Sequence, residues 1–324
     1  MVRSFKTCLF TQYSVNFHTS SFYPLILFLR RFDKDVQWRA QVTLIPAHTS
    51  SLDGFKVSRN CLQKAYKETS AKKLRARAIL LSSPNNPTGC VYDIETLMMI
   101  LAFAKQYDLH VICDEIYGGS VFGSPEFQSI ARVMSEDDVD RVHIIYGLSK
   151  DLGLPGLRVG VLYTENAKVL SAAKKMSRVY SVSTQTQFFL SHLLTDLAFV
   201  TDYLAENQQR LAYSRKVLVD ALEAIGVEVV EGNSGQYVWI NLGGLLESQD
   251  PAGEMALNSR LVYECGLVVT PGNDCHCAEP GWFRLCFGMV DVKVLHFVAQ
   301  RIERLIEMTP NGKIGGKRVL QNGL

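Results

Sequence analysis

The chain has 324 residues, of which 47% are hydrophobic and 20% are charged. This balance is typical of a protein with a buried core, and it excludes a disordered or low-complexity chain. The formal net charge is only +2 at pH 7, so electrostatics do not favour nucleic acid as a partner. The longest apolar run, from Tyr23 to Leu29, is far shorter than the roughly 20 residues that span a bilayer, which argues against a membrane protein.

The first 31 residues differ from the rest, because they contain four basic residues and no Asp or Glu. Organellar targeting peptides share this composition, and so does a wrongly predicted gene start. The absence of a regular amphipathic face favours the second interpretation. We therefore predict a cytoplasmic protein, with organellar targeting by residues 1–31 as the alternative. The eight cysteines are scattered and lie partly inside apolar runs, which indicates free thiols in a reducing compartment.

From Val42 onward, short β-branched runs alternate with longer helical stretches. The clearest helix is predicted from Asp93, which can cap its first turn, to Tyr107. Its apolar face would hold Ile94, Leu97, Leu101 and Ala104. Strands are predicted at 42–46, 78–82, 110–114, 142–147 and 157–163. Strands that alternate with helices indicate βαβ units, a mostly parallel sheet and an α/β fold.

After residue 163 the rhythm changes to that of an α+β unit. Helices are predicted at 167–178, 184–196, 201–225, 253–265 and 292–308, and strands at 227–230, 237–241, 267–270 and 282–287. The pattern predicts a large domain at 32–203 and a smaller one at 204–308. These domains would lie between the unmatched segment 1–31 and a polar, Gly-rich tail at 309–324.

Common nucleotide and zinc-protease motifs are missing from the sequence, including GxGxxG after a strand, GxxxxGK[ST] and HExxH. The segment Cys275-His276-Cys277 invites a zinc interpretation. Alternate residues of an extended segment point in opposite directions, however, and no second ligand pair lies at finger spacing. We therefore predict no metal site.

Four segments carry chemistry-bearing residues, although each has an ordinary explanation when taken alone. Ser-Pro-Asn-Asn-Pro-Thr-Gly at 83–89 is by itself a turn, and the acids of Cys-Asp-Glu-Ile-Tyr at 113–117 could be loop acids. The lysine of Gly-Leu-Ser-Lys-Asp-Leu-Gly-Leu-Pro-Gly-Leu-Arg-Val-Gly at 147–160 could be a solvated charge. The arginine of Glu-Pro-Gly-Trp-Phe-Arg-Leu-Cys-Phe at 279–287 lies among apolar neighbours, where burial favours an anionic partner.

Together these segments resemble the fold-type I enzymes that use pyridoxal phosphate (PLP), in the class I and II aminotransferase superfamily. The resemblance is closer to 1-aminocyclopropane-1-carboxylate (ACC) synthases and ACC-synthase-like proteins, and it extends from about Phe32 to about Glu307. It is carried by SKDLGLPGLRVG at 149–160, STQTQ at 183–187 and PGNDCHCAEPGWFRLCF at 271–287. The resemblance implies an aspartate aminotransferase-like fold: a mostly parallel sheet flanked by helices, a smaller α+β domain, and a homodimer when complete.

The resemblance also implies roles for individual residues. Lys150 would hold PLP as a Schiff base and act as the base at the substrate Cα. Asp114 would pair with the pyridine nitrogen, and Asn86 and Tyr117 would hydrogen-bond the ring oxygen. The catalytic set is therefore expected to be Lys150, Asp114 and Tyr117.

Two further sites for anions follow from the same resemblance. Arg158 would bind the cofactor phosphate through two parallel hydrogen bonds, with Ser149 as a second contact. Arg284 would bind the substrate carboxylate in the same way.

Three departures from the family pattern matter. Gly147 stands where the family usually has a serine that contacts the phosphate, and Thr88 stands where ACC synthases more often have leucine. The Thr88 form is common in aminotransferases. The family's N-terminal portion, with a phosphate-binding turn, a ring-stacking aromatic and a cross-dimer tyrosine, has no counterpart in residues 1–31. From these gaps we expect weak PLP binding and little turnover from this chain.

The sequence is compatible with three hypotheses about function. The first is an ACC-synthase-like lyase that converts S-adenosylmethionine into ACC and methylthioadenosine. The second is a PLP aminotransferase acting on an amino acid and a 2-oxo acid, because both reactions use the same apparatus. The third is a non-catalytic fragment that at most binds a partner subunit.

Overall fold

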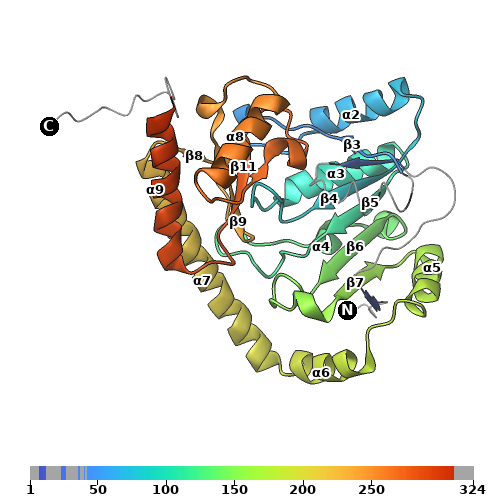
Figure 1. Cartoon of the computed structure of the whole chain (residues 1–324). Helices are drawn as coiled ribbons and strands as arrows, with labels where there is room; N and C mark the ends of the chain where they lie inside the picture. The colour runs from blue at the N-terminus through green and yellow to red at the C-terminus, as the bar shows by residue number, and fades with distance from the viewer. Residues whose placement is uncertain (1–6, 12–22, 27–35, 37–39, 41, 310–324) are drawn as a thin grey trace.

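The computed structural model describes residues 7–11, 23–26, 36, 40 and 42–309. A seven-stranded sheet forms its centre, with strand order β1-β7-β6-β5-β4-β2-β3 (Figure 1). Its strands are β1 (Thr7–Thr11), β2 (Tyr23–Ile26), β3 (Ile45–Pro46), β4 (Ala76–Ser82), β5 (His110–Asp114), β6 (Val142–Gly147) and β7 (Val159–Thr164). The pairs from β3 through β6 are parallel, and β7 is antiparallel to both of its neighbours. The predicted mostly parallel sheet is present.

Parallel pairing brings the ends of three strands to one edge of this sheet. Ser82 at the end of β4 pairs with Asp114 at the end of β5, and Asp114 pairs with Ile145 near the end of β6. The loops that follow β4, β5 and β6 therefore leave the sheet side by side. Ligands of open parallel sheets bind at this carboxyl edge, and three of the four chemistry-bearing segments begin there.

The helices of this part of the chain are α2 (Arg59–Ala71), α3 (Ile94–Gln106), α4 (Ile130–Val133), α5 (Ala167–Ser177) and α6 (Thr184–Thr195). Asp93 caps α3 by accepting a hydrogen bond from the Thr96 backbone N–H over 2.7 Å. The predicted apolar face of α3 is wrong at one position, because Ile94 is 48% exposed in the first turn. The residues that α3 buries are Leu97, Ile100, Leu101, Phe103 and Ala104.

A second sheet has the strand order β10-β11-β9-β8, and all of its pairs are antiparallel. Its strands are β8 (Glu228–Val229), β9 (Tyr237–Asn241), β10 (Thr270–Pro271) and β11 (Trp282–Cys286). Three helices belong to this part, α7 (Leu197–Ala224), α8 (Pro251–Tyr263) and α9 (Val292–Met308). Figure 1 shows α7 running from α6 towards this sheet, with α9 alongside it.

The two faces of the second sheet carry different kinds of side chain, because neighbouring residues of a strand point to opposite sides. One face packs into a buried apolar cluster with α7, α8 and α9, and includes Val238, Ile240, Phe283 and Leu285. The other face carries Tyr237, Trp239 and Arg284, and Trp239 is the cross-strand partner of Arg284. The second sheet thus presents polar and aromatic side chains away from its own core.

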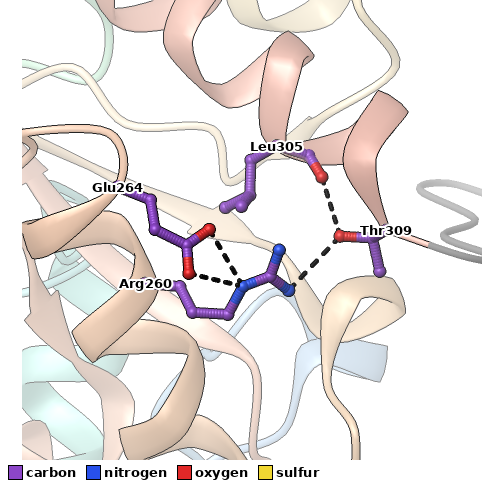
Figure 2. A network of polar contacts seen from close by, with 4 residues as sticks. All are labelled: Arg260, Glu264, Leu305 and Thr309. Carbon is purple, nitrogen blue, oxygen red and sulfur yellow. Dashed lines mark hydrogen bonds and ion pairs between the residues drawn. The ribbon is translucent and has the colours of Figure 1, made fainter.

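The far ends of α8 and α9 are joined by a small polar network (Figure 2). Arg260 on α8 donates to both carboxylate oxygens of Glu264 over 3.3 Å and to the Thr309 hydroxyl over 3.4 Å. Thr309 in turn donates to the Leu305 carbonyl over 2.7 Å. This network links the last turn of α8 to the C-terminal end of α9.

Several predicted element bounds are corrected by the structure. The strand predicted at 42–46 is reduced to Ile45–Pro46, and the one predicted at 267–270 lies at Thr270–Pro271. The strand predicted to begin at Leu157 begins at Val159, because Pro155–Leu157 forms a 3-10 turn. The helix predicted from residue 201 begins at Leu197, where Asp196 caps it.

The predicted domain boundary near Leu204 falls inside α7. The buried residues of α7 are Leu211, Leu218 and Leu222, which all follow that boundary and pack with the second sheet. The boundary itself stays a prediction. Among the helices of the described residues, none is both long enough and apolar enough to cross a membrane.

Candidate active site

Lys150 lies in the turn that follows β6, and its side chain is half-buried. Its Nζ atom lies 5.8 Å from the centre of the Tyr117 ring. Tyr117 belongs to the turn that follows β5 and is buried, with 5% of its surface exposed. The parallel pairing of β5 and β6 therefore brings an amine and a phenol from two loops together.

Asp114 is the last residue of β5 and lies close to this amine. One of its carboxylate oxygens accepts a hydrogen bond from the Ile116 backbone N–H over 3.2 Å. Burial raises the pKa of Asp114 to about 6, although that backbone hydrogen bond and the positive charge of Lys150 both act to lower it. A buried carboxylate with a raised pKa favours a cationic partner, and a protonated pyridine ring has that charge.

Tyr117 also contacts the second sheet through Tyr237. The two rings meet edge to face, with centres 5.4 Å apart and an interplanar angle of 89°. Burial raises the pKa of both phenols well above their ordinary value. Both hydroxyls are therefore protonated at neutral pH and can act as hydrogen-bond donors.

Arg284 on β11 is held by groups from both sheets. It donates to the Asn86 side-chain oxygen over 2.9 Å and to the Thr270 hydroxyl over 3.1 Å. Its guanidinium lies over the Tyr237 ring, 5.3 Å from the ring centre. Within the part of the chain that the structure describes, no carboxylate pairs with Arg284. The anionic ligand expected at Arg284 stays a prediction, and the described residues supply no carboxylate in its place.

Asn86 is presented by a rigid turn after β4. Asn85 donates to the Tyr92 hydroxyl over 2.7 Å and accepts from the Thr88 hydroxyl over 2.7 Å. The Asn86 oxygen is used by Arg284, so its amide N–H groups remain as donors. A cleft opens beside this turn and is lined by residues 85–88, Phe55, Trp239 and the segment 275–277.

The segment from Ser149 to Arg158 carries the two residues predicted to bind phosphate. The Ser149 hydroxyl oxygen is buried and has no hydrogen-bond partner among the described residues. Arg158 adopts a left-handed backbone conformation with φ of 55°, and its guanidinium donates to the Pro155 carbonyl over 2.8 Å. A buried hydroxyl without a partner is unusual in folded proteins, and a phosphate oxygen would satisfy it.

The seven predicted site residues thus fall into three sets in the structure. Lys150, Asp114 and Tyr117 lie together at the carboxyl edge of the large sheet. Asn86 and Arg284 form a pair between the two sheets. Ser149 and Arg158 lie on the loop that carries Lys150, one beside it and one at the far end.

Sequence reasoning missed several residues of this site, among them Tyr237, Trp239, Thr270 and Asp151. Tyr237 and Trp239 could have been found from the period of two along the strand, which places them on one face with the arginine of the neighbouring strand. Thr270 had no such signal, because it lies on a strand of only two residues, which shows no period. Asp151 had none because two of its three donors, Gly119 and Ser120, come from a different loop.

The segment Cys275-His276-Cys277 forms part of the wall of the cleft beside residues 85–88. Burial raises the pKa of both thiols to about 12, so both are protonated at neutral pH. The described residues hold no group of three or more His, Cys, Asp or Glu side chains placed to bind a metal.

Comparison with known proteins places this geometry in context. The model of the family described as aminotransferase class I and II matches residues 30–302. An ACC synthase of Cucurbita maxima is 41% identical over 85% of this chain and 59% of its own length. An ACC synthase of Solanum lycopersicum is 40% identical over 86% of this chain and 61% of its own length. The chain thus spans about three-fifths of the length of these relatives.

Solved structures show the same fold. An aromatic aminotransferase from Pyrococcus horikoshii has a TM-score of 0.81 at 20% identity, covering 94% of this chain and 80% of its own. An aspartate aminotransferase from Thermus thermophilus has a TM-score of 0.78 at 22% identity, covering 93% and 76%. The predicted aspartate aminotransferase-like fold is confirmed.

Proposed function

The chain belongs to the class I and II aminotransferases, and on this premise we propose that it provides the PLP and substrate site of an ACC-synthase-like enzyme. Enzymes of this fold and family depend on PLP. The substrate proposed is S-adenosylmethionine, and the products are ACC and methylthioadenosine. The observation that carries the proposal is the convergence of Lys150, Asp114 and Tyr117 at one sheet edge, facing an arginine without a carboxylate partner among the described residues.

The residues of the site fit the cofactor. Burial raises the pKa of Asp114, so a nearby positive charge would stabilise its carboxylate. We assign the Asp114 carboxylate to the pyridine nitrogen. Asn86 and Tyr117 keep N–H and O–H donors that we assign to the ring oxygen. Ser149 and Arg158 are assigned to the phosphate, because the buried Ser149 hydroxyl has no hydrogen-bond partner within the described part of the chain. When bound, PLP supplies an electron sink for the pair of electrons left at the substrate Cα.

The chain's own residues would then act on the substrate in order. Arg284 holds the α-carboxylate through parallel N–H donors and so fixes the orientation of Cα. The Lys150 amine removes the Cα proton and keeps it. The electron pair left at Cα displaces methylthioadenosine from Cγ, which breaks the Cγ–S bond and closes the three-membered ring. The buried aromatic rings of Tyr117 and Tyr237 exclude water from this side of the site.

Amino transfer to a 2-oxo acid is the alternative, because it uses the same residues. The sequence supports this alternative through Thr88, because threonine at this position of the turn is common in aminotransferases. In the structure Thr88 is buried and its hydroxyl is used within the turn, where it donates to Asn85 and accepts from the Cys90 N–H. Thr88 therefore stabilises the turn in either enzyme, and no observation favours the alternative.

Two further properties belong to this proposal. We place the protein in the cytoplasm, supported by the seven cysteines from Cys61 to Cys286, which are free thiols. We also propose a homodimer, supported by exposed apolar side chains on α6 and at the start of α7. Phe188 is 68% exposed and Leu197 is 72% exposed, which is costly for a surface left in water.

The first test asks whether Lys150 binds PLP. Purified protein is mixed with PLP, its visible absorbance is recorded, and borohydride is added before peptide mapping. We expect a phosphopyridoxyl label on Lys150 alone, which Lys150→Ala abolishes and Lys168→Ala at an exposed position leaves intact. A label on another lysine would overturn the assignment.

The second test separates the reactions. S-adenosylmethionine is supplied and ACC is measured by mass spectrometry, and in parallel an amino acid and a 2-oxo acid are supplied and amino exchange is measured. Formation of ACC supports the proposal, and exchange without ACC supports the alternative. The same assays on the chain extended with a relative's N-terminal portion test the expectation of weak PLP binding and low turnover. If the extended chain forms neither ACC nor the exchanged amino acid, the non-catalytic hypothesis is supported.

A further inference from the structure

Asp151, the residue next to Lys150, is a buried acid that the proposed chemistry does not use. None of its surface is exposed. Its carboxylate accepts three hydrogen bonds, from the Gly119 backbone N–H over 2.7 Å, the Ser120 hydroxyl over 2.6 Å and the Tyr146 hydroxyl over 3.0 Å. Burial raises the pKa of Asp151 while these three donors lower it, and no Lys or Arg among the described residues forms an ion pair with it.

These donors connect Asp151 to the loop that carries Tyr117. Gly119 and Ser120 follow β5, and the Ser120 N–H donates to the Tyr117 carbonyl over 2.9 Å. Tyr117 and Lys150 are the two groups whose side chains meet in the site, with Nζ 5.8 Å from the ring centre. One carboxylate therefore joins the two loops directly behind the two site residues.

The same segment reaches the second sheet. The Ser120 carbonyl accepts from the Gly235 N–H over 3.0 Å, two residues before Tyr237 on β9. The Gly119 carbonyl accepts from the Gln208 side chain on α7 over 3.0 Å. The segment that Asp151 anchors is thus fixed from both parts of the chain.

The fit around Asp151 is close. A Cβ atom on Gly119 would lie 2.9 Å from one Asp151 carboxylate oxygen, so the approach requires glycine. Three donors converge on two oxygens, and a carboxylate, which only accepts, can satisfy all of them. An asparagine amide would bring its own N–H donors against one of these donors.

We propose that Asp151 is a positioning residue that holds the Lys150 loop against the Tyr117 loop and so fixes where the Lys150 amine stands. Consecutive Cα atoms are about 3.8 Å apart, so fixing the Asp151 carboxylate leaves the Lys150 backbone little freedom. The inference rests on the proposed function of Lys150, but it concerns the place and protonation of that amine rather than turnover.

The test is therefore made on cofactor-free protein. Limited acetylation with acetic anhydride is followed across pH, and the rate at Lys150 is compared with that at the exposed Lys168 by peptide mass spectrometry. Asp151→Asn removes both the negative charge and the close fit. Because a buried negative charge is lost, we expect the pH midpoint of acetylation at Lys150 to fall. Because the amine moves, we expect the acetylation rate of Lys150 relative to Lys168 to change by about threefold or more. Asp93→Asn, which removes a carboxylate that only caps α3, is the matched control and should leave the profile unchanged.

Two further variants separate position from charge. Ser120→Ala and Tyr146→Phe each remove one donor and leave the Asp151 carboxylate in place. Positioning predicts that both also alter the relative rate at Lys150, by about twofold or more for the loss of one hydrogen bond. If these two variants match the parent, Asp151 acts through its charge alone or not at all, and the proposal fails.

These two variants also decide the question should Asp151→Asn not fold. Failure of the proposed function would show differently, as a parent protein that takes no phosphopyridoxyl label at Lys150 whatever the acetylation profile.

Discussion

The guanidinium of Arg284 donates to the side-chain oxygen of Asn86 over 2.9 Å, although 198 residues separate the two in the sequence. Asn86 belongs to the turn after β4 of the large sheet, and Arg284 lies on β11 of the small one. The group proposed to bind the substrate carboxylate is therefore oriented by the sheet that also holds Lys150. A shift of one sheet relative to the other would change both the carboxylate site and the hydrogen-bonding state of Asn86.

Replacement of Arg284 by lysine is the first prediction. A lysine keeps the charge but cannot donate to Asn86, to Thr270 and to a carboxylate in the fixed geometry of a guanidinium. Loss of one or two hydrogen bonds to a charged group should weaken amino-acid binding by about 10² to 10³-fold. KM or Kd for the substrate measures this, and the thermal midpoint should change little. Arg260→Lys, at the outer end of α8, is the control (Figure 2), and equal losses in the two variants would contradict the role of Arg284.

Asp114→Asn should have opposite effects on function and stability. The pKa of Asp114 is about 6 in the folded protein, above its ordinary value of 3.8. An acid whose pKa is raised by folding contributes stability that is complete below pH 3.8 and is lost as pH rises through about 6. Asparagine has no charge to bury, so the variant should be more stable than the parent above pH 6, and the gain should vanish towards pH 4.

In the chain extended with a relative's N-terminal portion, the same substitution should lower PLP-dependent turnover by at least about 10²-fold, because a neutral amide cannot hold the ring nitrogen protonated. Denaturant unfolding at pH 8 and at pH 4 measures the first effect, and the assays described above measure the second. Near-normal turnover would show that Asp114 is not the partner of the ring.

A pair of histidines at the opposite edge of the sheet predicts acid sensitivity. His143 on β6 is buried, its Nδ1 lies 2.8 Å from the Thr164 hydroxyl, and its Nε2 lies 2.9 Å from Nδ1 of His110 on β5. Burial, reinforced by the neighbouring His110, lowers the pKa of His143 to about 4 from 6.5. As pH falls, His143 is therefore protonated in the unfolded chain before it is protonated in the folded chain. The stability contributed by neutral His143 is complete above pH 6.5 and is lost as pH falls to about 4, a loss of up to about 3 kcal/mol.

His143→Gln isolates this contribution, because other groups titrate in the same range. Burial raises the pKa of Glu115 to about 7, so Glu115 changes stability with the opposite sign. Unfolding free energies of the parent and the variant should converge as pH falls from 6.5 towards 4. His296→Gln, at an exposed position on α9, should instead follow the parent. A constant difference between the parent and His143→Gln would refute the assignment.

Local patterns in the sequence predicted the elements with strong periodicity. β5, β6, β9 and α9 have the predicted bounds, since each combines an unbroken apolar pattern with clear flanking residues. A helical stretch between the first two predicted strands was expected, but the bounds of α2 were not predicted. Its sequence is mostly polar, and only Cys61, Leu62, Ala65 and Thr69 are buried. Periodicity detects a helix when its buried stripe is wide, and this stripe is narrow.

The candidate site was less accessible to sequence reasoning than the fold. The motif residues could be named because each lies in a recognisable local segment. Their partners could not, because the contacts of Arg284 with Asn86 and of Asp151 with Gly119 form only when distant loops meet. The ordinary explanation of Thr88 as a turn residue also needed the structure, which shows its hydroxyl bound to Asn85.

Restoring the serine that the family usually has at position 147 should strengthen PLP binding. Gly147 ends β6, two residues before Ser149, and a Cβ atom at position 147 would lie 3.1 Å from the Val159 carbonyl oxygen. That contact is tight but needs a shift of only a few tenths of an ångström. Gly147→Ser should therefore cost a little stability and gain one hydrogen bond to a charged phosphate, which is worth about tenfold or more in Kd. Gly147→Ala carries the same added Cβ without the hydroxyl and is the matched control. Titration with PLP, followed by absorbance, should rank serine above glycine and alanine at or below glycine. Equal affinities for the serine and alanine variants would mean that residue 147 does not face the phosphate, and that the loop from Ser149 to Arg158 binds it without help from the end of β6.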